Sequence, residues 1–136
     1  MARITLVNRS RERGEPLAQL LNDRVGVATE FVPWDGDFQV PADADLLVNA
    51  TSIGLSDADA RVPVDVSSLR DGLVVADVIF NPPRTRLIRD AEANGAITLD
   101  GLGMLVNQGV IGFKIWTGVD PDPQAMRAAL EEYLGL

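Results

Sequence analysis

The chain has 136 residues, a hydrophobic content of 46% and a formal net charge of −8 at pH 7. Its length suits one domain, its apolar content is enough for a core, and its acidity excludes nucleic acid as the main partner. Cysteine and histidine are absent, which excludes disulfides, thiolate metal sites and the usual neutral-pH proton shuttle. No apolar run approaches the roughly 20 residues of a membrane span, so we expect a soluble, cytoplasmic protein without a metal site.

The first two predicted elements are a strand and a helix. Residues 4–7 form a short apolar run that is typical of a strand. Residues 11–22 have helical periodicity, and Leu17, Leu20 and Leu21 fall on one face of that helix.

Three further strands are predicted in the middle of the chain. Residues 27–32 are rich in β-branched and aromatic side chains, and residues 72–77 form another apolar run. Residues 46–48 are wholly apolar, which indicates a strand of a parallel sheet that is buried on both faces. The connecting residues 33–43 and 51–69 contain glycine, proline and aspartate and are expected to be irregular.

The last third of the chain predicts one more strand between helices. Thr85 is a suitable cap for a helix that runs to Asn94, and Gly95 suits its left-handed end. The fifth strand follows at residues 96–99. Residues 102–116 are apolar almost all round, which is typical of a buried helix or of one shared with another domain.

The final helix has a clear start signal. Asp122 is a cap residue and Pro123 suits the first helical position before an amphipathic stretch at residues 124–134. The alternation of strands and helices over short connections predicts an α/β fold with a doubly wound, Rossmann-like parallel sheet of about five strands. We expect a single domain over residues 1–136, with its last two helices at residues 102–118 and 122–134.

Polar and glycine-containing motifs follow the predicted strands. Ligands in doubly wound sheets bind beyond the carboxyl ends of the strands. The motifs lie after the first, third, fourth and fifth strands, at residues 8–10, 49–52, 77–82 and 100–103. We therefore expect them to converge on one edge of the sheet and to form a binding site there.

The motif after the first strand suits a nucleotide that carries a 2′-phosphate. A dinucleotide fold that binds NAD commonly has an acidic residue here, whereas arginine accommodates NADP. Asn8, Arg9 and Ser10 follow the strand, and Arg13 lies one helical turn further on. A guanidinium group can form a forked, charge-assisted pair of hydrogen bonds with a phosphate. The alternative is that Ser10 caps the helix while the arginines are solvated.

Two further motifs have a binding interpretation and a structural one. Asn49, Thr51 and Ser52 belong to a polar turn that either approaches a ligand or is an ordinary side-chain-stabilised turn. Gly101 and Met104, at the start of the apolar helix, allow backbone approach and an adaptable apolar contact. Gln108 lies among apolar neighbours in the same helix, where it either satisfies backbone groups or binds a hydroxylated ligand.

Four stretches in the same order resemble the shikimate dehydrogenase family: NRSRER, NATSIG, DVIFNPPRT and DGLGMLVNQGVIGFKIWTG. The resemblance covers almost the whole chain and implies a NADP-dependent oxidoreductase. The family reduces 3-dehydroshikimate to shikimate with NADPH, in aromatic amino-acid and chorismate biosynthesis. The small-molecule substrate implied is therefore shikimate or 3-dehydroshikimate, and quinate is not distinguished from it.

The resemblance also implies roles for individual residues. The residues expected to bind the 2′-phosphate are Asn8, Arg9, Ser10 and Arg13. Those expected along the middle of the cofactor are Asn49, Thr51 and Ser52. Those expected around the nicotinamide are Val78, Gly101 and Met104. Gln108 is expected to bind the hydroxyl groups of shikimate. Phe80 stands where the family usually has a substrate-binding tyrosine, so that hydroxyl contact is absent.

The family also has parts that we do not find in this sequence. A separate N-terminal domain carries a catalytic Lys–Asp pair, and the first nucleotide-binding strand carries a glycine-rich loop. We therefore expect no catalytic residue in this chain and a Rossmann-like sheet truncated at its first central strand. The remaining strands are expected to pair directly, to accept a strand from another chain, or to belong to half of a protein.

Two interpretations of function follow. In the first, the chain is the NADP-binding portion of a shikimate dehydrogenase, inactive alone and completed by a missing N-terminal half. In the second, it is a truncated, non-catalytic relative that binds a nucleotide or a protein. Unpaired strands also predict self-association.

Overall fold

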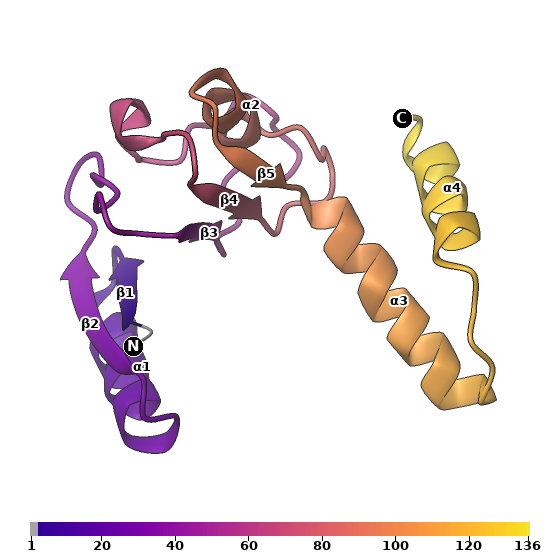
Figure 1. Cartoon of the computed structure of the whole chain (residues 1–136), viewed down its shortest axis with the longest axis horizontal. Coiled ribbons are helices and arrows are strands. Elements are labelled where there is room, and N and C mark those ends of the chain that lie inside the picture. The colour runs from indigo at the N-terminus through magenta and orange to yellow at the C-terminus, as the bar shows by residue number, and fades with distance from the viewer. Residues whose placement is uncertain (1–2) are drawn as a thin grey trace. The chain divides into compact units, whose positions relative to one another are not determined.

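The computed structural model describes residues 3–136 of the chain, which divide into two compact units (Figure 1). The first unit ends at Gln39 and the second begins at Val40. The first contains β1 (Arg3–Asn8), α1 (Arg11–Arg24) and β2 (Ala28–Pro33). The second contains β3 (Leu46–Asn49), β4 (Val74–Asp77), α2 (Arg86–Ala93), β5 (Ile97–Leu99), α3 (Gly101–Thr117) and α4 (Pro123–Leu134), with a short 3₁₀ turn at Val66–Ser68.

In the first unit, α1 packs closely on a two-stranded sheet. Strands β1 and β2 are parallel, and Leu6 lies opposite Phe31 in their register. A Cβ atom built on Gly14 would lie 2.0 Å from the ring of Phe31, so only glycine allows the helix to approach this closely. The buried residues of α1 are Gly14 and Ala18. The close contact therefore depends on small residues in the helix and on the aromatic ring of the strand.

The buried face of α1 is formed by small residues and not by its row of leucines. Leu17 and Leu20 are exposed, whereas Gly14 and Ala18 are buried. Helical periodicity identifies a row of leucines, but a short helix-to-sheet distance requires small residues on the contacting face.

In the second unit, β3, β4 and β5 form a parallel sheet in that order. Helix α2 connects β4 to β5 and buries Leu87, Ile88 and Ala91. Leu73 and Val75 are fully buried as well. Thr85 caps α2 by accepting a hydrogen bond from the amide of Ile88, as predicted.

The opposite face of this sheet is open. Residues paired in register point to the same face, and two such rows cross the sheet: Leu46, Val74 and Ile97, and then Val48, Ala76 and Leu99. The outer members of both rows, which belong to β3 and β5, are exposed large apolar residues. The prediction that residues 46–48 are buried on both faces is therefore wrong, because α2 covers only one face. We call these six residues the open sheet face.

The predicted α/β fold class is confirmed. All the strand pairs are parallel and helices connect strands, as a Rossmann-like α/β fold requires. The strands form a sheet of two and a sheet of three.

The two C-terminal helices leave much apolar surface exposed. Helix α4 packs against α3 (Figure 1), and Asp122 caps it, as predicted, by accepting from the amide of Gln124. In α3 the buried residues are Gly101, Leu102 and Val106, all in the first half. Ile115 and Trp116 are 74% and 84% exposed. The sequence predicted either a buried helix or one shared with another domain. Burial within the chain is observed only for the first half of α3.

None of the helices in residues 3–136 is long and apolar enough to cross a membrane.

Candidate functional site

The segment after β1 forms a tight polar turn. The Asn8 side-chain oxygen accepts a hydrogen bond of 2.8 Å from the amide of Ser10. The Ser10 carbonyl then accepts from the amides of Arg13 and Gly14, which begins α1. The side chain of Ser10 makes no capping hydrogen bond. The alternative role of Ser10 as a side-chain cap is therefore not observed, and its hydroxyl is available to a ligand.

Two of the three arginines in this segment are uncommitted. Arg11 pairs with Glu15 and lies over the Phe31 ring, with its guanidinium carbon 5.8 Å from the ring centroid. The guanidinium groups of Arg9 and Arg13 are exposed and form no ion pair or hydrogen bond with the residues described from position 3 onward. Helix N-termini favour anions because their amides and dipole are positive there. These two cations at the start of α1 can therefore bind a phosphate.

In the second unit, the ends of β3 and β4 share a buried polar cluster. Asn49, Asp77 and Thr85 are 4%, 2% and 1% exposed. The Asn49 amide donates to Asp77 Oδ1 over 3.0 Å, and the Thr85 hydroxyl donates to Asp77 Oδ2 over 2.7 Å. No buried side-chain oxygen or nitrogen among the described residues lacks a partner. A cluster of this kind is costly when incomplete and rigid when complete.

The predicted turn after β3 is organised by the same cluster. Asn49 Oδ1 accepts from both the amide and the hydroxyl of Thr51, and the Thr51 hydroxyl accepts from the amide of Ile53. The Asn49 carbonyl also accepts from the amide of Val78 over 3.1 Å. Ser52, within the turn, is exposed. The predicted residues Asn49, Thr51 and Val78 are thus held together at the carboxyl ends of neighbouring strands.

The start of α3 approaches the segment after β4 through a glycine. A Cβ atom on Gly101 would lie 2.4 Å from the carbonyl oxygen of Ile79 and 2.6 Å from that of Val78. Asp100 caps the helix by accepting from the amide of Gly103 over 3.1 Å. Position 101 therefore requires glycine because the start of α3 packs directly on the backbone of Val78 and Ile79. A contact of Gly101 with nicotinamide stays a prediction.

The other predicted residues in this unit are more open. Phe80 is partly exposed, and Met104 and Gln108 are exposed. Met104 and Gln108 are four positions apart in α3 and share a face of it. Gln108 was expected among buried apolar neighbours, and this is wrong because only the first two turns of α3 are buried. An exposed amide needs no internal partner, so Gln108 is available to a ligand.

The structure gathers part of the predicted site and adds two residues to it. In the second unit, hydrogen bonds and close backbone packing link Asn49, Thr51, Val78 and Gly101. The sequence interpretation did not predict that Asp77 and Thr85 form the centre of this cluster. The available signal was a carboxylate that ends a buried apolar strand, because a buried charge needs donors nearby.

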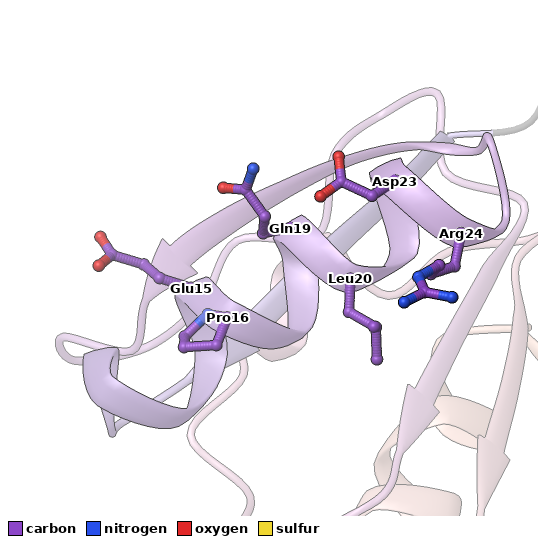
Figure 2. Close-up of a pocket in the computed structure, with 6 residues that line it drawn as sticks. All are labelled: Glu15, Pro16, Gln19, Leu20, Asp23 and Arg24. Atoms are coloured by element: carbon purple, nitrogen blue, oxygen red, sulfur yellow. The ribbon is translucent and has the colours of Figure 1, made fainter.

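One shallow hollow of about 480 Å³ lies elsewhere, on α1. Figure 2 shows the residues that line it, which are Glu15, Pro16, Gln19, Leu20, Asp23 and Arg24. None of the predicted site residues lines it. Among the residues that the structure describes, no group of acidic side chains is arranged to hold a metal ion.

Residues 101–131 match the family model of the shikimate 5′-dehydrogenase C-terminal domain. A shikimate dehydrogenase (NADP(+)) from Methanopyrus kandleri is 41% identical over 134 residues, which are 96% of this chain and 46% of that protein. The chain is a relative of the shikimate dehydrogenases. It spans about half the length of the curated shikimate dehydrogenases that it matches.

Two solved structures of relatives extend this comparison. The ligand-free 5-ketofructose reductase of Gluconobacter sp. strain CHM43 is 52% identical, with a TM-score of 0.93 over 97% of this chain and 48% of that one. The quinate dehydrogenase from Corynebacterium glutamicum in complex with NAD is 31% identical, with a TM-score of 0.79 over 99% of this chain and 55% of that one. The chain thus shares its fold with proteins that have different substrates in their names.

Proposed function

We propose that this chain is the NADP-binding portion of an oxidoreductase of the shikimate dehydrogenase family. The observation that carries the proposal is the pair of uncommitted cations, Arg9 and Arg13, beside the free hydroxyl of Ser10 at the start of α1. A dianionic 2′-phosphate is the ligand that such a group recognises. The relatives whose names specify NADP(+) support the same assignment.

The proposed cofactor contacts follow the order of the motifs. Asn8, Arg9, Ser10 and Arg13 bind the 2′-phosphate through charge-assisted and neutral hydrogen bonds. In the second unit, the middle of the dinucleotide is bound by Asn49, Thr51 and Ser52. The nicotinamide is bound by Val78, Gly101 and Met104, and the substrate by Phe80 and Gln108. When bound, NADPH supplies the hydride that converts a ketone to a secondary alcohol. The chain's own residues bind and orient the reactants.

Turnover is proposed to require groups from outside these 136 residues. The chain's one lysine, Lys114, is paired with Asp120 over 2.6 Å and lies on the exposed half of α3. Neither histidine nor cysteine is present to act as a proton donor. The open sheet face and the exposed residues of α3 provide apolar surface for a second polypeptide half. We expect the chain alone to bind NADP without oxidising shikimate.

The favoured substrate pair is shikimate and 3-dehydroshikimate, which the names of the curated relatives support. A second candidate is 5-ketofructose, because the relative of that name has 52% identity. Phe80, which lacks a phenolic hydroxyl, is compatible with a substrate other than shikimate. Both candidates are polyhydroxylated ketones, and hydride addition to either gives a secondary alcohol.

The decisive experiment is a titration of NADP and NAD into the purified chain by calorimetry. We expect saturable NADP binding and weaker binding of NAD, because NAD lacks the 2′-phosphate. Equal affinities would overturn the assignment of Arg9 and Arg13, and no binding of either would favour the alternative of a protein-binding module.

Activity is tested by adding a separately produced N-terminal half of the Gluconobacter relative to the chain. NADPH oxidation is then followed with 3-dehydroshikimate and with 5-ketofructose. Turnover by the isolated chain would contradict the requirement for a second half.

A further inference from the structure

The cluster of Asn49, Asp77 and Thr85 does more than satisfy buried groups. The Asp77 carboxylate receives three hydrogen bonds from three separate chain segments. Asn49 Nδ2 and the amide of Ile79 donate to Oδ1, each over 3.0 Å, and the Thr85 hydroxyl donates to Oδ2 over 2.7 Å. These donors belong to the end of β3, to the segment after β4 and to the start of α2.

The chemistry of each position is specific to its partners. Only a carboxylate can accept at both oxygens while donating nothing, which Asp77 requires. The Asn49 side chain donates to Asp77 through its nitrogen and accepts from Thr51 through its oxygen, so it uses both ends of the amide. The Thr85 hydroxyl donates to Asp77 and accepts from the amide of Ile88 through a single oxygen atom.

The segments that the cluster joins carry residues proposed to bind the cofactor. Asn49 positions the turn with Thr51, and Asp77 fixes the amide of Ile79, next to Val78. Gly54, at the end of the turn, lies close to Thr85, because a Cβ atom built on this glycine would be 3.1 Å from the Thr85 methyl carbon. The amide of Ser56 donates to the carbonyl of Asn81 over 3.2 Å, which is a second tie between the same two segments.

We infer that Asp77 is a positioning residue that holds the turn after β3 and the segment after β4 in the arrangement required by the nicotinamide half of NADP. This inference rests on the proposed function. Asp77 and Thr85 are buried and therefore act through Thr51 and Val78, which are less buried. The adenosine half is assigned to residues of the first unit and does not depend on Asp77.

The main test variant is Thr85→Val, which keeps the shape of the side chain and removes its hydroxyl. Asp77 Oδ2 is then buried without a donor, and the two segments are expected to shift. Thr85→Ser retains the hydroxyl and serves as the conservative rescue. Ala91→Gly is the matched control, because Ala91 is fully buried in α2 and glycine weakens that helix without touching the cluster.

Affinity is measured for NADP and for adenosine 2′,5′-bisphosphate, at a temperature where every variant is folded. The bisphosphate carries the phosphate recognised by the first unit and lacks the nicotinamide. We expect Thr85→Val to weaken NADP binding by about tenfold, the order expected for one buried group left without its partner, with little change for the bisphosphate. Thr85→Ser and Ala91→Gly should bind both ligands like the unaltered chain.

Hydrogen exchange of the free chain provides a second readout. The amide of Ile53 donates to the Thr51 hydroxyl, and the amide of Ile79 donates to Asp77. Because no nucleotide is present in this measurement, their exchange rates report these two hydrogen bonds alone. We expect both to exchange faster in Thr85→Val and to be unchanged in Ala91→Gly.

The outcomes separate the inference from the proposed function. If the unaltered chain binds neither ligand, the proposed function fails and the inference fails with it. If the unaltered chain binds both ligands but Thr85→Val and Ala91→Gly give the same affinities and exchange rates, only the inference is overturned. Equal weakening of NADP and bisphosphate by Thr85→Val would also overturn it.

Discussion

The two units of this chain hold their polar groups in opposite ways. In the first unit, Arg9 and Arg13 are exposed and uncommitted, beside a serine hydroxyl that caps nothing. In the second unit, Asn49, Asp77 and Thr85 are buried and fully bonded to one another. Exposed cations suit a ligand that carries the opposite charge, whereas a flat ring needs groups held at fixed positions around it. The comparison indicates that the first unit is suited to recognising a charged group and the second to holding a ligand in a fixed position.

The largest effect should come from the position where α3 meets backbone. Gly101→Ala would place a methyl group within 2.6 Å of two carbonyl oxygens, and neither can move as a side chain does. We expect a loss of about 3 kcal/mol in the free energy of unfolding, the upper range for overpacking. The measurement is urea denaturation. This change would show how far the second unit depends on a fixed arrangement.

Gly103→Ala is the matched control in the same helix. A Cβ atom there has nothing nearer than 3.9 Å, so alanine should leave stability unchanged or raise it by up to about 1 kcal/mol. Equal destabilisation by both variants would contradict the close approach at Gly101.

The first unit is tested by Arg9→Ala. The affinity for NADP should fall by about 1.5–3 kcal/mol, the range for a hydrogen bond to a charged group, and the affinity for NAD should change little. Calorimetry measures both. Arg86→Ala is a suitable control, because Arg86 is already paired with Asp90 in the second unit. An unchanged NADP affinity in Arg9→Ala would remove this residue from the site.

The smallest effect on stability is expected on the open sheet face. Ile97→Thr and Leu99→Thr alter exposed side chains, so the free energy of unfolding should change by no more than about 0.5 kcal/mol. Self-association in sedimentation should nevertheless decrease, because a large exposed apolar patch favours contacts between molecules. Val75→Thr, on the covered face, should instead destabilise the chain. Unaltered self-association in the first two variants would mean that another surface causes it.

Much of the fold was predictable from local patterns. The strand and helix positions and the caps at Thr85 and Asp122 follow from short-range chemistry, and the parallel pairing follows from the alternation of strands and helices. Burial was less predictable, because it depends on which elements cover a surface. Val48 is as apolar as Val75, yet only Val75 lies under α2 and its neighbours. No sequence pattern distinguishes the two.

The candidate site shows the same limit. In the second unit the ends of β3 and β4 lie together, as expected for neighbouring parallel strands, which end at a common edge. Asp77 was visible as a polar residue after a strand, but its three donors come from positions 49, 79 and 85. Such a cluster depends on side-chain geometry that spacing does not encode. The exposure of Gln108 likewise depends on where α3 leaves the body of the second unit.

The contact between Gly14 and Phe31 links two distant choices of amino acid. A methyl group at position 14 would occupy space that the aromatic ring now fills, so a larger residue there calls for a smaller one at position 31. Gly14 directly follows Arg13 in the first turns of α1. Any exchange of volume between these two positions would therefore change the distance between α1 and the sheet and, with it, the position of Arg13 relative to the strands.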